Sequence, residues 1–205
     1  MNKINYNKKM EEIIISLAGK KAKLLLHSCC APCSSYVLEY LSSSFDITLY
    51  YYNQNIHPES EYIRRFNELK DFTGEVYKGK IEIISETYNP TEFFDTIHNY
   101  EDKAEGGSRC SLCYHMRLKK AAERAKEGGF DYFGSVLTIS PHKNADRINL
   151  IGANLEKIYN IKFLYSDFKK NNGFKRSLEI SREYDLYRQQ YCGCSFSIRN
   201  QAECL

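Results

Sequence analysis

The residues best suited to do chemistry in this 205-residue chain are its cysteines, seven of which fall in three short clusters. The clusters are Cys29, Cys30 and Cys33; Cys110 and Cys113; and Cys192 and Cys194. Thiolates bind soft metal ions and carry out redox reactions, but a single C-x-x-C pair is a weak signal for either. Three clusters in one chain are a much stronger signal, so we predict that distant parts of the backbone bring these thiols to one site.

The number of clustered thiols indicates which kinds of metal site they could form. A structural zinc ion takes four ligands and a 4Fe-4S cluster takes four thiolates, so three of the seven thiols are left over. Those three could hold a second metal ion with an open coordination position, which points to reductive chemistry. Spacing alone leaves an iron–sulfur site, a zinc site, thiol redox chemistry and buried free cysteines all open. We interpret the eighth cysteine, Cys204, as a spare thiol.

The first cluster lies between an apolar strand and a helix. Residues 24–27 read L-L-L-H, and Pro32 suits the first turn of a helix that follows. In open α/β sheets, ligands bind where strands end and the next helices begin. Because a helix amino end favours negative charge, we predict that Cys33 is the thiol most easily held as a thiolate. His27, inside the strand, is predicted to be a core residue and not a ligand.

Strands and helices alternate along most of the chain. Apolar runs predict strands at residues 24–27, 47–52, 81–85, 132–137 and 161–165. Such alternation requires parallel strands joined by right-handed crossovers. The predicted fold class is therefore α/β, a Rossmann-like three-layer sandwich with a mainly parallel sheet and a metal site at the carboxyl ends of the strands.

This scaffold is similar to the adenine nucleotide alpha hydrolase-like domains, but the expected phosphate loop is absent. The loop after the first strand carries thiols in place of a glycine-rich or S-G-G-x-D-S sequence. Nucleotide hydrolysis and adenylation are therefore not expected.

Helical patterns predict which side chains avoid the core. In the helix that begins at residue 60, we place Arg64 and Arg65 outside the apolar stripe. In the helix that follows Cys113, Arg117 falls on a different face from the apolar residues. We read the segment 89–92, N-P-T-E, as a capping box, and we place Ile158 on the inward face of its helix.

Length and composition favour one α/β domain over residues 1–205, with a peripheral helix in 1–20 and a tail at 195–205. The net charge of +3 neither requires nor excludes a nucleic-acid partner. The apolar run at residues 13–18 is too short for a membrane span and poorly flanked for an export signal. We therefore expect a cytoplasmic protein in a reducing compartment, where metal or redox chemistry is favoured over a disulfide framework.

Histidines and cations are weaker candidates. His57 and His142 lie in loops after strands, where functional residues concentrate. Several cations could contact phosphate or simply form a solvated face: Arg64, Arg65, Arg117, Lys120, Arg124, Lys143, Arg147 and Arg188. From both groups we take five residues as candidates for substrate binding: His57, His142, Lys143, Arg117 and Arg188.

Five motifs follow one another from about Leu24 to Ser197. They read L-L-L-H-S-C-C-A-P-C-S, Y-Y-N-Q-N-I-H-P-x-x-E-Y-x-R-R, R-C-x-x-C-Y-x-x-R-L, I-S-P-H-K-N and Y-R-Q-Q-Y-C-G-C. Together and in this order they resemble the QueH family of epoxyqueuosine reductases over nearly the whole chain. The resemblance implies an enzyme that reduces epoxyqueuosine to queuosine at the wobble position of tRNA anticodons, the last step of queuosine biosynthesis.

The same resemblance implies a 4Fe-4S cluster beside a second, mononuclear iron, and an external electron donor. It implies metal ligands at Cys29, Cys30, Cys110, Cys113, Cys192 and Cys194, with Cys33 as the seventh. Which four thiols hold the cluster, and whether the catalytic iron site includes Cys33, stays open at this point. Two other functions also stay open: a zinc-stabilised RNA-binding module, and a thiol–disulfide oxidoreductase that uses Cys110 and Cys113.

Overall fold

The computed structural model describes residues 4–198 and has a five-stranded parallel sheet at its centre. The strands are β1 (Ala22–His27), β2 (Phe45–Tyr51), β3 (Glu82–Ser85), β4 (Tyr132–Ser135) and β5 (Lys162–Phe163), in the order β3-β2-β1-β4-β5. Every neighbouring pair is parallel. Strand β1 occupies the middle because its three leucines are apolar on both faces and fully buried. The predicted α/β class is confirmed.

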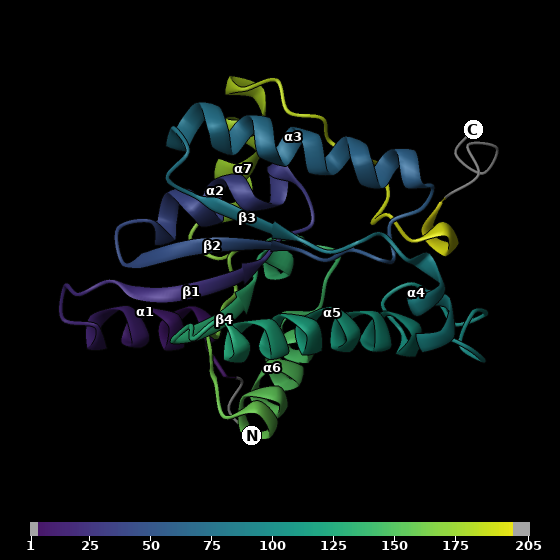
Figure 1. Cartoon of the computed structure of the whole chain (residues 1–205), viewed down its shortest axis with the longest axis horizontal. Coiled ribbons are helices and arrows are strands. Elements are labelled where there is room, and N and C mark those ends of the chain that lie inside the picture. The colour runs from purple at the N-terminus through teal and green to yellow at the C-terminus, as the bar shows by residue number, and fades with distance from the viewer. Residues whose placement is uncertain (1–3, 199–205) are drawn as a thin grey trace.

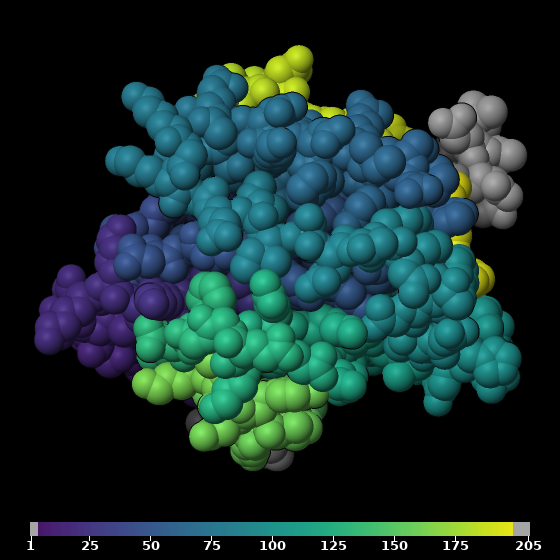
Figure 2. Space-filling model, viewed as in Figure 1, coloured from purple at the N-terminus to yellow at the C-terminus, as the bar shows by residue number. Residues whose placement is uncertain are grey.

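Helices cover both faces of the sheet (Figure 1). On one face lie α2 (Ala31–Leu41), α3 (Glu59–Tyr77) and α7 (Gly173–Glu183), and on the other lie α5 (Ser108–Glu127) and α6 (Ala145–Tyr159). Figure 2 shows, from the same side, how α3 forms the upper part of the surface and α5 and α6 the lower part. This arrangement gives the three layers that alternating strands and helices require.

Shorter elements complete the chain. Helix α1 (Tyr6–Ser16) lies beside the residues after β5, where Tyr6 stacks on Tyr165 with ring centroids 6.4 Å apart. Helix α4 (Pro90–Thr96) precedes α5, and two short 3-10 helices, η1 (Val136–Ile139) and η2 (Ser195–Ser197), follow β4 and end the described chain. Within residues 4–198, each helix is too short or too polar to cross a bilayer.

The capping box expected at residues 89–92 does not form. The side chain of Asn89 makes no capping hydrogen bond to helix α4. Instead the backbone N–H of Asn89 donates to Oε1 of Gln54, 2.6 Å away. A tertiary contact from the loop after β2 has replaced the local one, so the prediction was wrong in its partners although the helix begins at Pro90.

Three predicted surface or core positions are also corrected. Arg65 and Arg117 were placed outside the apolar faces of their helices, yet both are buried. Each guanidinium is covered by a segment from another part of the chain, which helical spacing cannot reveal. Ile158, expected to face inward, is 68% exposed because it lies on the flank of the α6 face that buries Ile148 and Leu155.

Candidate metal centre

The three cysteine clusters meet at one pocket of about 240 Å³ at the carboxyl ends of the strands. Five of the seven thiols line it directly: Cys33, Cys110, Cys113, Cys192 and Cys194. Cys29 and Cys30 lie behind Cys33, and the sulfurs of these three residues lie within 4.8 Å of one another. Loops after β1, β2 and β4 frame the pocket, so it lies where the strand order turns from β1 to β4. In parallel sheets, ligands bind at such a switch point.

The first cluster is positioned by the short connection between β1 and α2. The backbone N–H of Ser28 continues the sheet by donating to the carbonyl of Tyr50, 2.9 Å away. Cys30 then occupies the N-cap position of α2 in an extended conformation, without a side-chain capping hydrogen bond, and Pro32 lies in the first turn. Cys33 therefore lies one helical turn beyond Cys30, which allows the three sulfurs to gather.

The second cluster lies in the first two turns of α5. Cys110 and Cys113 are three residues apart, so both side chains leave the same face of the helix. The backbone N–H of Gly106 donates to Sγ of Cys110, 3.2 Å away. Arg147 on α6 holds the preceding turn by donating to the carbonyl of Gly107 at 2.9 Å. The α5 amino end is thus fixed from two sides.

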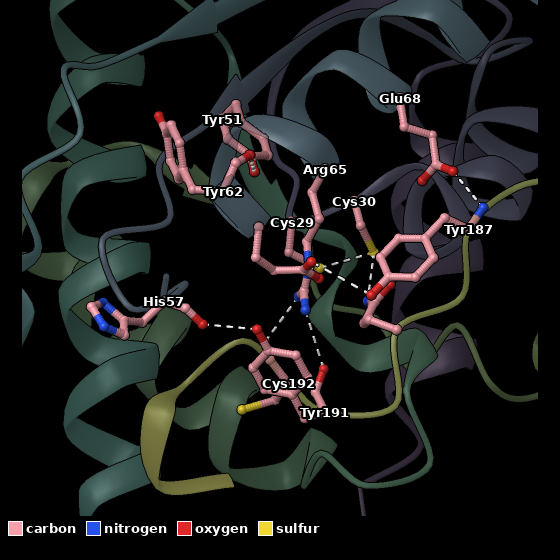
Figure 3. A network of polar contacts seen from close by, with 12 residues as sticks. Cys29, Cys30, Tyr51, His57, Tyr62, Arg65, Glu68, Tyr187, Tyr191 and Cys192 are labelled. Carbon is pink, nitrogen blue, oxygen red and sulfur yellow. Dashed lines mark hydrogen bonds and ion pairs between the residues drawn. The ribbon is translucent and has the colours of Figure 1, made fainter. Parts of the chain in front are cut away.

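The third cluster is carried by the segment after α7, and helix α3 holds that segment. Arg65 donates from Nη1 to the carbonyl of Cys192 at 3.2 Å and from Nη2 to the carbonyl of Tyr191 at 3.4 Å. Its Nε forms a buried ion pair with Glu61 at 2.7 Å. Figure 3 shows Arg65 reaching from α3 to this segment, beside Cys29 and Cys30. A buried guanidinium therefore links the third cluster to the first.

The loop after β2 holds the same segment from the other side. The backbone N–H of His57 donates to the carbonyl of Gly193 at 2.8 Å, and the hydroxyl of Tyr191 donates to the carbonyl of His57 at 2.8 Å (Figure 3). Gly193 has φ +106°, and a Cβ there would come within 2.7 Å of Cγ1 of Ile56. Only glycine fits this turn without strain.

Replacing Gly193 with alanine should therefore displace the third cluster. The positive φ alone costs about 1 kcal/mol or more for alanine, and the contact with Ile56 adds to that cost. We expect a lower free energy of unfolding and reduced metal content in anaerobically purified protein, measured by chemical denaturation and by metal analysis. Gly79→Ala is the control, because Gly79 also has a positive φ but lies in the turn after α3, with nothing within 4 Å of an added Cβ. Equal metal loss in both variants would contradict the prediction.

Two cations face the thiols. Arg117 is buried and donates from Nε to Nε2 of His27 at 3.2 Å and from Nη2 to Oδ1 of Asn53 at 2.6 Å. Burial alone would lower the pKa of Arg117, but the sulfurs of Cys113 and Cys29 raise it above its usual value. Burial would also lower the pKa of the half-buried Lys143, but Cys29 raises this pKa above its usual value. Both groups stay charged and make the pocket favourable for thiolates.

His27 is a core residue, as predicted. It is fully buried, and burial together with Arg117 lowers its pKa to about 3, so its ring is neutral. Its Nδ1 lies 3.0 Å from the hydroxyl of Ser135, and its Nε2 lies 3.2 Å from Nε of Arg117 and 3.1 Å from the carbonyl of Tyr52. The ring therefore orients Arg117 at the base of the pocket.

Each of two clusters favours one thiolate. Hydrogen bonds from Cys30 and Cys33 hold the pKa of Cys29 well below its usual value, and a hydrogen bond from Cys194 does the same for Cys192. The same contacts raise the pKa of Cys33 well above its usual value. The prediction that Cys33 is the easiest thiolate was wrong, because its thiol donates to Cys29 and the helix amino end does not outweigh that contact.

The structure brings together four of the five residues that we selected for substrate binding. Arg117, His142, Lys143 and Arg188 line the pocket with the thiols. His57 does not line it: its side chain is exposed, and its backbone holds the third cluster. Cys204 lies outside the described residues. The polar lining residues that sequence reasoning missed include Asn55, Arg109 and Gln189, although each of these lies within one of the motifs.

The comparisons with known proteins decide the family. The model of the family described as epoxyqueuosine reductase QueH matches residues 24–200, most of the chain. The chain belongs to the QueH family of epoxyqueuosine reductases. It is thus an enzyme of a reductase family.

Individual QueH relatives match over most of their length. The chain is similar to "Epoxyqueuosine reductase QueH" of Streptococcus pyogenes serotype M1, with 45% identity over 97% of this chain and 80% of the relative. It is similar to the protein of the same name from Staphylococcus epidermidis, with 45% identity over 97% and 87%. The relative from Thermotoga maritima is 32% identical over 88% of this chain and 92% of its own.

Proposed function

We propose that this QueH chain reduces epoxyqueuosine to queuosine at the wobble position of tRNA in the cytoplasm, with electrons from an external donor. The observation that carries the proposal is the meeting of three separate cysteine clusters at one pocket. Reductive removal of an epoxide oxygen consumes two electrons and two protons and releases water. Seven thiols supply four ligands for a 4Fe-4S cluster and three for a second iron with an open position.

The sulfur spacing supports a division of the thiols. In a tetrahedral site with metal–sulfur bonds of about 2.3 Å, two sulfurs lie about 3.8 Å apart. The sulfurs of Cys29 and Cys30 are 3.7 Å apart, and Cys33 completes a set within 4.8 Å. We therefore assign Cys29, Cys30 and Cys33 to the second iron. The four remaining thiols, Cys110, Cys113, Cys192 and Cys194, then hold the cluster.

When bound, these groups would supply electrons and a Lewis acid for the epoxide oxygen. The residues of the chain do the rest. Arg117 and Lys143 offset the negative charge of the thiolates, which would otherwise repel electrons entering the site. The walls of the pocket exclude water from the reacting base, and Lys143 and Arg188 at its rim are placed to contact the tRNA backbone.

The test is anaerobic incubation of the iron-loaded protein with tRNA that carries epoxyqueuosine and a strong reductant, followed by nucleoside analysis. We expect queuosine to form in proportion to time and enzyme. A colourless protein with one zinc ion and no product would favour the RNA-binding module. Product formed by the metal-free protein would favour a thiol–disulfide enzyme at Cys110 and Cys113.

Salt should weaken the reaction on tRNA. Each phosphate contact that Lys143 or Arg188 makes releases counterions, so kcat/KM should fall roughly tenfold between about 50 and about 200 mM salt, as two contacts predict. The effect should appear in KM and leave kcat unchanged. The matched measurement uses the free epoxyqueuosine nucleoside, for which the rate should not depend on salt. A salt-independent KM for tRNA would rule out phosphate contacts at the rim.

A further inference from the structure

Three buried polar atoms in the wall of the metal pocket have no hydrogen-bond partner among residues 4–198. They are Oδ1 of Asn55, Nε of Arg109 and Oε1 of Gln189, and all three residues line the pocket. Buried polar atoms in proteins are nearly always paired, because an unpaired one loses its hydrogen bonds to water without replacement. Three such atoms around one pocket indicate that a polar ligand completes them.

Asn55 differs from its two neighbours in the loop after β2. Asn53 donates to the carbonyl of Ser28 at 2.8 Å and accepts from Arg117 at 2.6 Å. Gln54 donates to the carbonyl of Thr87 at 3.0 Å and accepts from the N–H of Asn89. These four bonds fix the loop on both sides. Asn55 is 1% exposed, and its Oδ1 has no hydrogen-bond partner within the described residues.

The other two groups make one bond each and leave one atom free. Nε2 of Gln189 donates to Sγ of Cys30 at 3.1 Å, which orients the amide and leaves Oε1 as an acceptor. Arg109 donates from Nη1 to the carbonyl of Glu101 and leaves Nε as a donor. The residues that line the pocket thus carry two unpaired acceptors, Oδ1 of Asn55 and Oε1 of Gln189, and one unpaired donor, Nε of Arg109.

We propose that Asn55 reads the edge of the substrate base. An amide places a carbonyl beside an N–H, and this pair complements the adjacent N1–H and O6 of a guanine-type base. Epoxyqueuosine is a 7-deazaguanine and keeps that edge. The inference rests on the proposed function for the identity of the base, and it makes Asn55 a specificity-determining residue. Gln189 and Arg109 then contact the rest of the nucleoside.

The first test separates ligand binding from a structural role. Asn55→Leu keeps the branching of the side chain at Cγ and replaces both polar atoms with methyl groups. Because Oδ1 of Asn55 has no partner to lose among residues 4–198, the thermal midpoint and the iron content should stay close to the wild-type values. The dissociation constant for tRNA that carries epoxyqueuosine should rise roughly 10- to 100-fold, the range expected for a bidentate contact to a base.

The control variant lies two residues away. Asn53→Leu removes the acceptor for Nη2 of Arg117 and the donor to the carbonyl of Ser28. It should therefore lower the thermal midpoint. If Asn55→Leu lowers the midpoint to the same extent, Asn55 is a structural residue and the proposal is overturned. Tight substrate binding by a stable Asn55→Leu protein would overturn it equally.

The second test varies the base. Two tRNAs differ only at the wobble position, with guanosine in one and 2-aminopurine, which lacks N1–H and O6, in the other. Wild-type protein should bind the tRNA with guanosine more tightly, whereas Asn55→Leu should bind both tRNAs with the same affinity. Such a result shows that the effects of the residue and of the base on binding are coupled. Equal preference in both proteins would overturn the proposal. If the preference depends on Asn55 but wild-type protein forms no queuosine, the base-reading role stands and the proposed reduction fails.

Discussion

Replacing Cys113 with serine should remove the visible absorbance of anaerobically purified protein, about four of its iron atoms and all activity on tRNA. Cys113 is buried at the first turns of α5 beside Cys110 and Cys192, so a neighbouring thiol cannot take its place without moving the helix. Burial raises the pKa of its thiol to about 11, so a bound metal is what would hold it as a thiolate. Metal analysis and absorption spectra of the purified variant measure the effect.

Two matched cysteine variants sharpen this prediction. Cys33→Ser should lose about one iron atom and activity but keep the spectrum of the cluster, if the first three thiols hold the second iron. Cys204→Ser should keep metal, colour and activity. A coloured Cys113→Ser protein would show that the ligand assignment is wrong at that position, and a colourless Cys33→Ser protein would reverse the proposed division of the thiols.

Replacing Arg65 with methionine should give the largest loss of stability among the non-cysteine variants. The change leaves the Glu61 carboxylate buried without its partner, which costs about 3 to 5 kcal/mol. It also removes the donors that hold the carbonyls of Tyr191 and Cys192. We expect the thermal midpoint to fall by about 10 °C. Iron content should fall too, because the third cluster loses its anchor on α3.

Arg64 provides the matched control for Arg65. It is the preceding arginine on the same helix, it is exposed, and its guanidinium lies 3.3 Å from the ring centre of Tyr187. Arg64→Met should change the free energy of unfolding by less than about 1 kcal/mol and should leave the iron content unchanged. The double variant Glu61→Leu, Arg65→Met should regain part of the stability but not the iron. Normal iron content in Arg65→Met would contradict the anchoring role.

The described structure explains why these two neighbouring arginines could not be told apart beforehand. Helical spacing places both outside the apolar stripe of α3, which is correct as a statement about the helix alone. Arg65 is buried only because the segment that carries Tyr191 and Cys192, more than 120 residues later, folds over it. Arg117 is a second case, since its partner His27 comes from β1 and its partner Asn53 comes from the loop after β2.

The sequence by itself determined the three-layer arrangement of helices and sheet, and it determined that the cysteine clusters come together at one edge of the sheet. The fully apolar Leu24–Leu26 run could only be a central parallel strand, and in an alternating α/β chain, cysteines at strand ends and helix starts must come to one edge of the sheet. Apolar patterns of this kind are local, so they can be read along the chain. The family motifs are also local stretches of sequence, so they can be read in the same way.

Tertiary structure decided how each polar group is partnered. Asn53 and Asn55 are the same residue type in one loop, yet the amide of Asn53 makes two hydrogen bonds, whereas Oδ1 of Asn55 has no partner within the described residues. Cys29, and not Cys33, is the favoured thiolate because of which sulfur accepts hydrogen bonds. Hydrogen-bond partners and burial depend on atoms from distant segments. The residues that neighbour a side chain in the sequence therefore do not predict them.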